Sequence, residues 1–319
     1  MAKDRNVLIT GAGGYIGRLL VQRLAADHEG LGRVVAADIK VPPEDDRLDT
    51  IEYVAADVRD RSLAEVMREQ EIDVVVHLAA IVTPGRRPDH ELEYSVDVLG
   101  TKNVLDCCLE AGVGHFIYTS SGAAYGYYAD NPVPLHEDDS LRGNDAFAYS
   151  RHKRLVEEML ERWRADHPEL KQLVLRPGTI LGSTARNQIT ALFERRIVLG
   201  VRGADSPFVI IWDEDVVSAI ELGLREGREG VYNLAGDGVL TLRDMASIMG
   251  KPYVALPAGL VAGALWLLRR GHLTQYGPEQ VDFLRYRPVL GNDRLKSELG
   301  YVPKKTTREA FDHYLANRS

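Results

Sequence analysis

The chain has 319 residues, of which 45% are hydrophobic and 27% charged, as is typical of one large globular domain or two linked ones rather than of a disordered chain. Its formal net charge of -8 provides no basic field, so we expect no nucleic-acid partner. The two cysteines, Cys107 and Cys108, are adjacent, which argues against a mutual disulfide or a spaced metal-ligand set, so we expect a cytoplasmic protein without a metal. The N-terminus shows no secretory signal pattern.

Apolar strand-like runs alternate with amphipathic helical stretches through the first two-thirds of the chain. The predicted strands cover residues 7–10, 34–38, 51–55, 74–77, 116–120 and 173–176. Continuous Val, Ile and Leu runs of this kind are typical of parallel strands that are buried on both faces. The predicted crossover helices include residues 18–26, 61–69, 96–111 and 148–164. The pattern predicts an α/β fold with a doubly wound parallel sheet.

A glycine-rich turn joins the first predicted strand to the first predicted helix. It reads Thr10-Gly11-Ala12-Gly13-Gly14-Tyr15-Ile16-Gly17. In such a turn Gly11 permits the tight bend, Gly14 lets the backbone approach a pyrophosphate, and Gly17 lets the helix pack closely on the sheet. The helix N-terminus favours negative charge. The turn therefore predicts a dinucleotide site, and the alternative is a turn with a purely structural role.

An acidic residue, Asp38, ends the second predicted strand, about 20 residues after Gly17. A carboxylate there accepts hydrogen bonds from the adenosine ribose hydroxyls and repels a 2′-phosphate. We therefore expect NAD rather than NADP. Arg33 and Lys40 lie nearby in the sequence and would soften that repulsion.

Tyr149 and Lys153 stand four residues apart at the start of the helix predicted over residues 148–164. This spacing places both side chains on one helix face. A phenol is a poor base at neutral pH, but a lysine ammonium and a positive nicotinamide ring would lower its pKa. Tyr149 is thus a candidate general base, although Tyr and Lys at this spacing also occur on ordinary exposed helices.

After Pro177 the alternation weakens, with one further strand–helix unit at residues 208–225 and then a proline-punctuated, mostly helical region. We expect a smaller substrate-binding domain there, because open α/β sheets bind ligands beyond the carboxyl ends of their strands. The predicted NAD-binding domain comprises residues 1–177 and 206–234, and the substrate domain residues 178–205 and 235–319. The apolar segment 254–268 is too short to span a membrane, and we expect a buried helix or a lid and no membrane partner.

The chain resembles the extended short-chain dehydrogenase/reductase family, in particular its NAD-dependent epimerase/dehydratase type and 3β-hydroxysteroid dehydrogenase-like members. The resemblance covers nearly the whole chain. It rests on the glycine-rich turn, Asp57-Val58, His77-Leu78-Ala79-Ala80, Gly100-Thr101-Lys102-Asn103, Ser120-Ser121-Gly122-Ala123-Ala124-Tyr125-Gly126, the Tyr149/Lys153 pair and Arg176-Pro177-Gly178. It implies a Rossmann fold, NAD as the cofactor and an enzymatic activity.

The resemblance also implies roles for individual residues. The third catalytic hydroxyl falls on Ser121, with Ser120 and Thr119 as alternates, beside Tyr149 and Lys153. Asp57 and Val58 are expected at the adenine, Lys153 at the nicotinamide ribose, and His77 in a structural role. The full set of expected NAD contacts is Gly11, Gly13, Gly14, Tyr15, Ile16, Gly17, Asp38, Asp57, Val58, Leu78, Ala79, Ala80, Tyr149, Lys153, Pro177 and Thr179.

Four positions depart from patterns common in this family. Asp97 replaces a structural Asn, and Thr179 replaces an Asn that sugar-nucleotide enzymes commonly carry. Gly122 and Ala123 stand where sugar-nucleotide dehydratases carry acids, and neither side chain can transfer a proton, which argues against dehydration.

Three functions stay open at this point. The first is epimerisation of a nucleoside-diphosphate sugar, such as a UDP-sugar, through a transient 4-keto intermediate. The second is NAD-dependent oxidation or reduction of a bulky apolar hydroxy or keto substrate, such as a steroid-like alcohol. The third is a catalytically silent NAD-binding sensor, since fold alone never fixes function. The resemblance further implies a homodimer through the helices at residues 96–111 and 148–164.

Overall fold

The computed structural model describes residues 4–82, 89–186, 188–204, 207–271, 277–278 and 280–318. Its centre is a seven-stranded parallel sheet in the order β11-β6-β5-β4-β1-β2-β3. The strands are β1 (Arg5–Thr10), β2 (Leu31–Asp38), β3 (Glu52–Ala55), β4 (Val74–His77), β5 (His115–Thr119), β6 (Lys171–Pro177) and β11 (Gly230–Leu234). The predicted doubly wound parallel sheet is confirmed.

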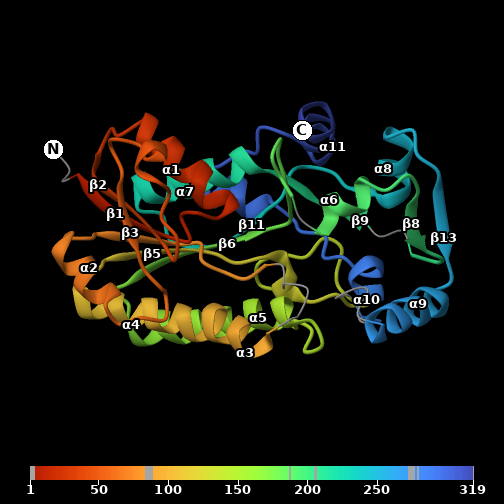
Figure 1. The fold of residues 1–319 in the computed structure, drawn as a ribbon, viewed down its shortest axis with the longest axis horizontal. Coiled ribbons are helices and arrows are strands. Elements are labelled where there is room, and N and C mark those ends of the chain that lie inside the picture. The colour runs from red at the N-terminus through yellow and green to blue at the C-terminus, as the bar shows by residue number, and fades with distance from the viewer. Residues whose placement is uncertain are drawn as a thin grey trace.

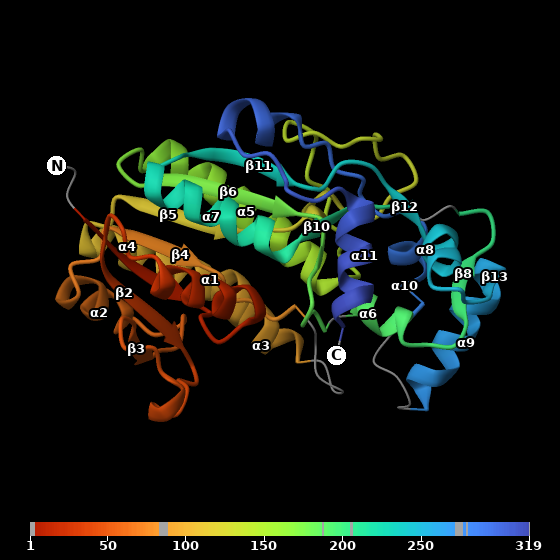
Figure 2. The same ribbon diagram turned by 90° about the horizontal axis from the view of Figure 1, so that it is seen from above.

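Helices cover both faces of this sheet (Figure 1, Figure 2). One face carries α1 (Tyr15–Ala26) and α7 (Asp213–Glu226), and the other carries α2 (Leu63–Glu69), α4 (Thr101–Ala111) and α5 (Ala148–Asp166). Successive strand side chains point to opposite faces, so in β1 Val7 and Ile9 join the first core and Leu8 joins the second. This alternation is why the strands read as continuous apolar runs.

Two helices differ from their predicted form. α1 begins at Tyr15, three residues earlier than expected, because the glycine turn itself leads into the helix. The helix predicted over residues 96–111 is α-helical only from Thr101. It is preceded by α3 (His90–Tyr94) and a π-helical segment (Ser95–Gly100) in which the Thr101 hydroxyl donates to the Asp97 carbonyl at 2.6 Å.

The region after Pro177 contains more strand than predicted. Three two-stranded sheets form there: β7 (Thr179–Leu181) with β10 (Ile210–Trp212), β9 (Pro207–Phe208) with β12 (Leu240–Thr241), and β8 (Val198–Val201) with β13 (Tyr253–Leu256). The helices are α6 (Gln188–Phe193), α8 (Leu242–Ile248), α9 (Ala258–Arg270), α10 (Gln280–Arg285) and α11 (Thr307–Asn317). The strands of the predicted unit at residues 208–225 do not join the central sheet, whose last strand is instead β11. The proposed division into two domains stays a prediction.

We expected a buried helix or a lid for the apolar segment 254–268, and the structure contradicts the buried helix. The first residues of this segment belong to β13, and Pro257 separates this strand from α9. None of the residues of α9 is buried. No helix among the described residues is both long and apolar enough to cross a membrane.

Candidate active site

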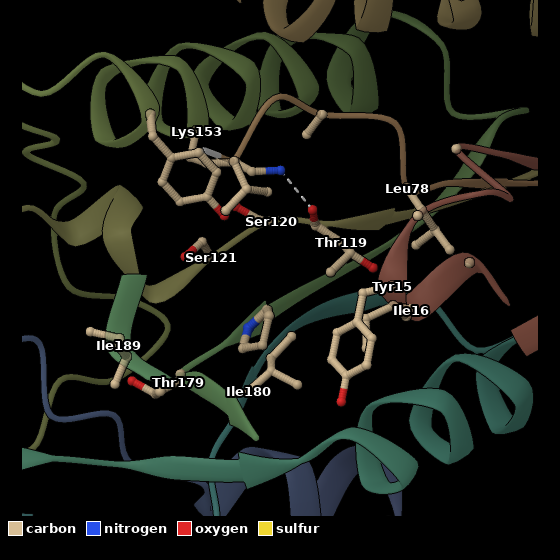
Figure 3. Close-up of a pocket in the computed structure, with 18 of the residues that line it drawn as sticks. Tyr15, Ile16, Leu78, Thr119, Ser120, Ser121, Lys153, Thr179, Ile180 and Ile189 are labelled. Atoms are coloured by element: carbon tan, nitrogen blue, oxygen red, sulfur yellow. Dashed lines mark hydrogen bonds between the residues drawn. The ribbon is translucent and has the colours of Figure 1, made fainter. Parts of the chain in front are cut away.

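A cavity of about 350 Å³ lies at the carboxyl ends of the central strands (Figure 3). The strand order reverses between β1 and β4, and ligands of open α/β sheets bind at such a switch point. Tyr15, Ile16 and Leu78 border the cavity on one side, and Thr179 and Ile189 on the other. The predicted site residues in its wall are Gly11, Gly14, Tyr15, Ile16, Gly17, Leu78, Ala80, Ser121, Tyr149, Lys153, Pro177 and Thr179.

The glycine turn has the shape that a dinucleotide needs. Gly11 has φ 72°, and a Cβ there would lie 2.5 Å from the backbone nitrogen of Ala79, so no other residue fits. A Cβ at Gly17 would collide with the Gly11 carbonyl. α1 begins after Gly14 without a side-chain cap, and the N–H groups of an uncapped helix start suit a pyrophosphate. These residues therefore fit NAD.

Asp38 lies beside the turn rather than in the cavity wall. Its Oδ2 accepts a hydrogen bond from the Gly13 backbone at 3.0 Å, and a Cβ at Gly13 would crowd this carboxylate. The Arg33 guanidinium donates to Gln70 and the Glu69 carbonyl. Arg33 thus points toward α2 rather than toward Asp38.

The remaining expected NAD contacts outside the wall have clear structural neighbours. Ala79 packs against Gly11, and a Cβ at Gly100 would lie 2.7 Å from Val58 Cγ2. The Arg59 guanidinium forms an ion pair with Asp57 at 2.5 Å and lowers the pKa of that carboxyl. A role for Asp57 and Val58 at the adenine stays a prediction.

Tyr149 and Lys153 both reach the cavity from the first turns of α5. Lys153 Nζ donates to the Thr119 carbonyl at 2.8 Å and to the Tyr118 hydroxyl at 2.9 Å, and it lies 5.7 Å from the centroid of the Tyr149 ring. Figure 3 shows Lys153 reaching from α5 toward Thr119. The sequence analysis did not identify Tyr118. It lies within a buried strand and belongs to none of the motifs that point to catalysis.

Ser120 and Ser121 both line the cavity, but their hydroxyls have different partners. The Ser121 hydroxyl accepts from the Ala123 backbone at 3.1 Å and interacts with the Tyr149 hydroxyl. The Ser120 hydroxyl, by contrast, donates to Glu157 at 2.5 Å, and Glu157 forms a buried ion pair with Arg176 at 2.6 Å. This arrangement favours Ser121 over Ser120 as the catalytic hydroxyl.

Burial dominates the titration of Tyr149 and Lys153. It raises the pKa of Tyr149 well above that of a free phenol, an effect that Asp97 reinforces and Ser121 partly offsets. Burial also lowers the pKa of Lys153 to about 8, although Asp97 and Glu157 favour its charged form. We expect the Lys153 ammonium and a positive nicotinamide ring together to lower the pKa of Tyr149, and this stays a prediction. Burial opposes the ammonium charge, so the lowering would depend on the ring as well.

Two buried polar residues near the pair have structural partners. His77 hydrogen-bonds Thr10 at 2.6 Å and Thr101 at 3.0 Å, and burial lowers its pKa to about 3, in keeping with its expected structural role. Asp97 accepts from the Ile81 backbone at 2.8 Å and lies 2.9 Å from His152 Nδ1. Asp97 thus holds the loop after β4 against α5. An Asn at this position could also accept the hydrogen bond from the Ile81 backbone.

Three aromatic rings form the wall of the cavity beyond Tyr149 and Lys153. Tyr127 and Phe283 have ring centroids 5.0 Å apart, and Phe147 lies 5.7 Å from each of them. These residues come from a loop, the start of α5 and α10, so only the folded chain brings them together. The sequence contains no spacing that could have predicted this wall.

Arg287 borders the same wall and was also missed. Its guanidinium lies over Phe208 and Phe283, at 4.2 and 4.5 Å from the ring centroids, and donates to the Thr179 hydroxyl at 3.0 Å. Burial lowers its pKa, and Nη1 has no hydrogen-bond partner among the described residues. A buried guanidinium with an unused donor suits an anionic or carbonyl group of a substrate.

Comparisons with known proteins agree with this geometry. Residues 7–235 match the model of the NAD dependent epimerase/dehydratase family. An uncharacterised protein of Mycobacterium tuberculosis is 30% identical over 98% of this chain and 84% of its own length. A 3beta-hydroxysteroid-dehydrogenase/decarboxylase of Arabidopsis thaliana is 27% identical over 98% of this chain and 81% of its own length. The solved UDP-glucose 4-epimerase of Thermotoga maritima has a TM-score of 0.75 at 20% identity, with 98% of both chains covered.

Proposed function

Because the chain belongs to the NAD-dependent epimerase/dehydratase family, we propose that it transfers hydride between NAD and a secondary alcohol or ketone carbon, with Tyr149, Lys153 and Ser121 as its catalytic residues. NAD, when bound, accepts or returns the hydride and adds a positive charge in its oxidised form. The turn from Gly11 to Gly17 and Asp38 would hold its pyrophosphate and its adenosine ribose.

The three side chains divide the proton chemistry between them. Tyr149 is protonated over the neutral range because burial raises its pKa, so it can donate a proton to a ketone oxygen during reduction. Ser121 offers a hydrogen bond to the same oxygen as negative charge develops there. Lys153, held by Thr119 and Tyr118, supplies a nearby positive charge that stabilises the phenolate left behind.

The aromatic wall formed by Tyr127, Phe147 and Phe283 carries our proposal for the substrate, which is an alcohol or ketone with a bulky apolar body. Three rings packed side by side favour an apolar partner through burial of its surface. Thr179, in place of the Asn common in sugar-nucleotide enzymes, and the similarity to a plant hydroxysteroid dehydrogenase support the same choice. Of the functions that the sequence left open, oxidation or reduction of an apolar substrate is therefore our first candidate.

Arg287 favours a second candidate, epimerisation of a nucleoside-diphosphate sugar. Arg287 lines the cavity, its buried Nη1 has no hydrogen-bond partner among the described residues, and a guanidinium binds phosphate groups in a bidentate manner. Gly122 and Ala123 stand where a dehydratase would need acids, and neither side chain can transfer a proton. Dehydration is therefore not among our candidates.

A single experiment separates the two candidates. The purified protein is incubated with NAD and either apolar secondary alcohols, such as sterols, or UDP-glucose, and both NADH and the sugar products are measured. We expect stoichiometric NADH from an apolar alcohol. Formation of UDP-galactose without net NADH would instead establish epimerisation, and the absence of both from the whole panel would favour the sensor. In Arg287→Met the KM for a diphosphate substrate should rise, with that for a neutral alcohol unchanged.

We also propose a homodimer through α4 and α5, which lie side by side on one face of the sheet (Figure 1). Exposed apolar side chains also occur on α3 and the π-helical segment that precede α4, at Leu92, Tyr94 and Leu99. A cytoplasmic location, expected from the two cysteines, remains a proposal of the same kind.

A further inference from the structure

Helix α9 presents an apolar surface that the described part of the chain leaves exposed. Residues 258–268 contain no charged side chain, and none of the residues of α9 is buried. Leu260, Trp266 and Leu267 are 63%, 52% and 64% exposed. Single exposed apolar residues are common, but a contiguous apolar surface of this kind marks an interaction site.

The neighbouring β8–β13 pair extends this apolar surface. Leu199 and Val254 are direct partners in the parallel register, and both are exposed, as is Ile197 before β8. Pro257 alone separates β13 from α9. Both views place α9, β8 and β13 at the same end of the molecule, away from the N-terminal strands (Figure 1, Figure 2).

The two segments that form this surface carry only basic charges. Residues 195–204 and 251–271 contain no Asp or Glu, and the acids Glu194 and Asp205 flank the first of these segments in the sequence. The basic residues in these two segments are Arg195, Arg196, Arg202, Lys251, Arg269 and Arg270. This local excess of cations stands out in a chain whose formal net charge is -8. An apolar surface bordered by cations complements an anionic phospholipid bilayer.

We propose that α9 and the β8–β13 pair dock this protein on the surface of a membrane that contains anionic lipids. At 13 residues, α9 is about 20 Å long, too short for a bilayer core of about 30 Å, so it would lie in the interface rather than span it. Tryptophan side chains favour the headgroup region of a bilayer. The ring of Trp266 lies 5.6 Å from the guanidinium of Arg270, a cation that would face the same headgroups. The Leu side chains of α9 would enter the acyl region.

A second copy of the chain is a poorer occupant for this surface. A two-fold interface sets the same patch against itself, so the cations of one copy would face those of the other. Like charges across an interface oppose association. A bilayer with anionic headgroups has no such conflict.

The position of α9 connects the docking surface to the cavity. α9 packs against α10, and Phe283 of α10 belongs to the aromatic wall. Docking would therefore bring the wall close to the bilayer, where an apolar substrate is dissolved. The docking itself does not depend on the proposed function and is tested without substrate.

Cosedimentation with lipid vesicles tests the proposal. The protein is mixed with vesicles of phosphatidylcholine alone or of equal parts phosphatidylcholine and phosphatidylglycerol. We expect binding to the mixed vesicles, with a blue shift of Trp fluorescence, and at least about tenfold weaker binding by the triple variant Leu260→Ser/Trp266→Ser/Leu267→Ser. The variant Arg269→Gln/Arg270→Gln should lose much of the preference for phosphatidylglycerol.

A matched control keeps this test specific. Val239→Ser/Val302→Ser removes side chains that are 51% and 64% exposed elsewhere and should bind vesicles like the wild type. NAD affinity and melting temperature should be unchanged in all variants, which shows that they are folded. Equal vesicle binding by the triple variant and the wild type would overturn the proposal. The proposal would also be overturned if the protein formed a dimer without lipid and the triple variant alone were monomeric. The surface would then bind a second copy of the chain.

Discussion

Lys153 Nζ donates a hydrogen bond to the Tyr118 hydroxyl at 2.9 Å, and the Tyr118 ring lies directly against it, with its centroid 4.6 Å away. Lys153 thus has two phenols beside it, Tyr118 within the sheet and Tyr149 in the cavity. Burial raises the pKa of Tyr118 far above the neutral range, so Tyr118 stays protonated and acts as an acceptor for the ammonium. This bond favours the charged form of Lys153 against the desolvation that lowers its pKa to about 8.

Tyr118→Phe should therefore lower the pKa of Lys153 further. In the direction of ketone reduction, the ammonium form is present below the pKa of Lys153 and is lost as the pH rises through it. We expect kcat/KM to fall near pH 8 in the wild type and at a lower pH in Tyr118→Phe, with little change in rate well below both values. A pH profile of kcat/KM measures this. If kcat/KM of the variant fell at the same pH as that of the wild type, or at a higher pH, the role of Tyr118 would be refuted.

Asp38→Asn should weaken the preference for NAD over NADP. The carboxylate beside Gly13 would repel a 2′-phosphate, and Asn keeps the acceptor for the Gly13 backbone but loses the charge. We expect the ratio of NADP to NAD dissociation constants to fall by about tenfold, as measured by direct titration. Tighter binding of NADP than of NAD by the wild type would contradict the assignment of Asp38.

Arg176→Met should destabilise the fold more than a comparable surface change. Arg176 is buried and bonds Glu157 and the Tyr125 hydroxyl, so its loss leaves a buried carboxylate without its cation. We expect the free energy of unfolding to fall by about 3–5 kcal/mol in a urea titration. Arg61→Met, which breaks an exposed ion pair with Glu110, is the control and should be close to the wild type. Equal stability of the two variants would show that the buried network does not support the fold.

Leu99→Arg should produce a monomer. Leu99 is 50% exposed on the π-helical segment before α4, so the substitution is compatible with the folded chain and places a charge in the proposed dimer interface. Sedimentation velocity should show a dimer for the wild type and a monomer for the variant. A monomeric wild type would remove the proposed interface.

The central sheet could be predicted because its signals are local. Residues 74–77, for example, form a strand with all four side chains buried. A short run of three valines is typical of such a buried strand. β11 was missed because its run, Gly230–Leu234, opens with Gly and carries Tyr232 and Asn233 within a short apolar stretch. Segment 254–268 misled for another reason. Hydropathy alone does not distinguish a helix that packs on its own domain from one that stays exposed.

The candidate site shows the same division between local and long-range signals. The glycine turn and the Tyr149/Lys153 pair are sequence motifs, and the structure brings them into one cavity. Phe283 and Arg287 lie far along the chain, and their approach to Tyr127 and Thr179 depends on how the C-terminal region packs on the sheet. The burial of Tyr149, which raises its pKa, could not be predicted from the sequence because it depends on the tertiary structure.

The most direct test of hydride chemistry at this cavity is the rate of hydride transfer in Tyr149→Phe. With the best substrate from the panel above, we expect a loss of at least about 100-fold in kcat, with NAD affinity unchanged. Tyr127→Phe keeps the aromatic wall and should retain most of the activity, which makes it the matched control. A Tyr149→Phe variant that transfers hydride at the wild-type rate would contradict the assignment of Tyr149 as the acid–base group.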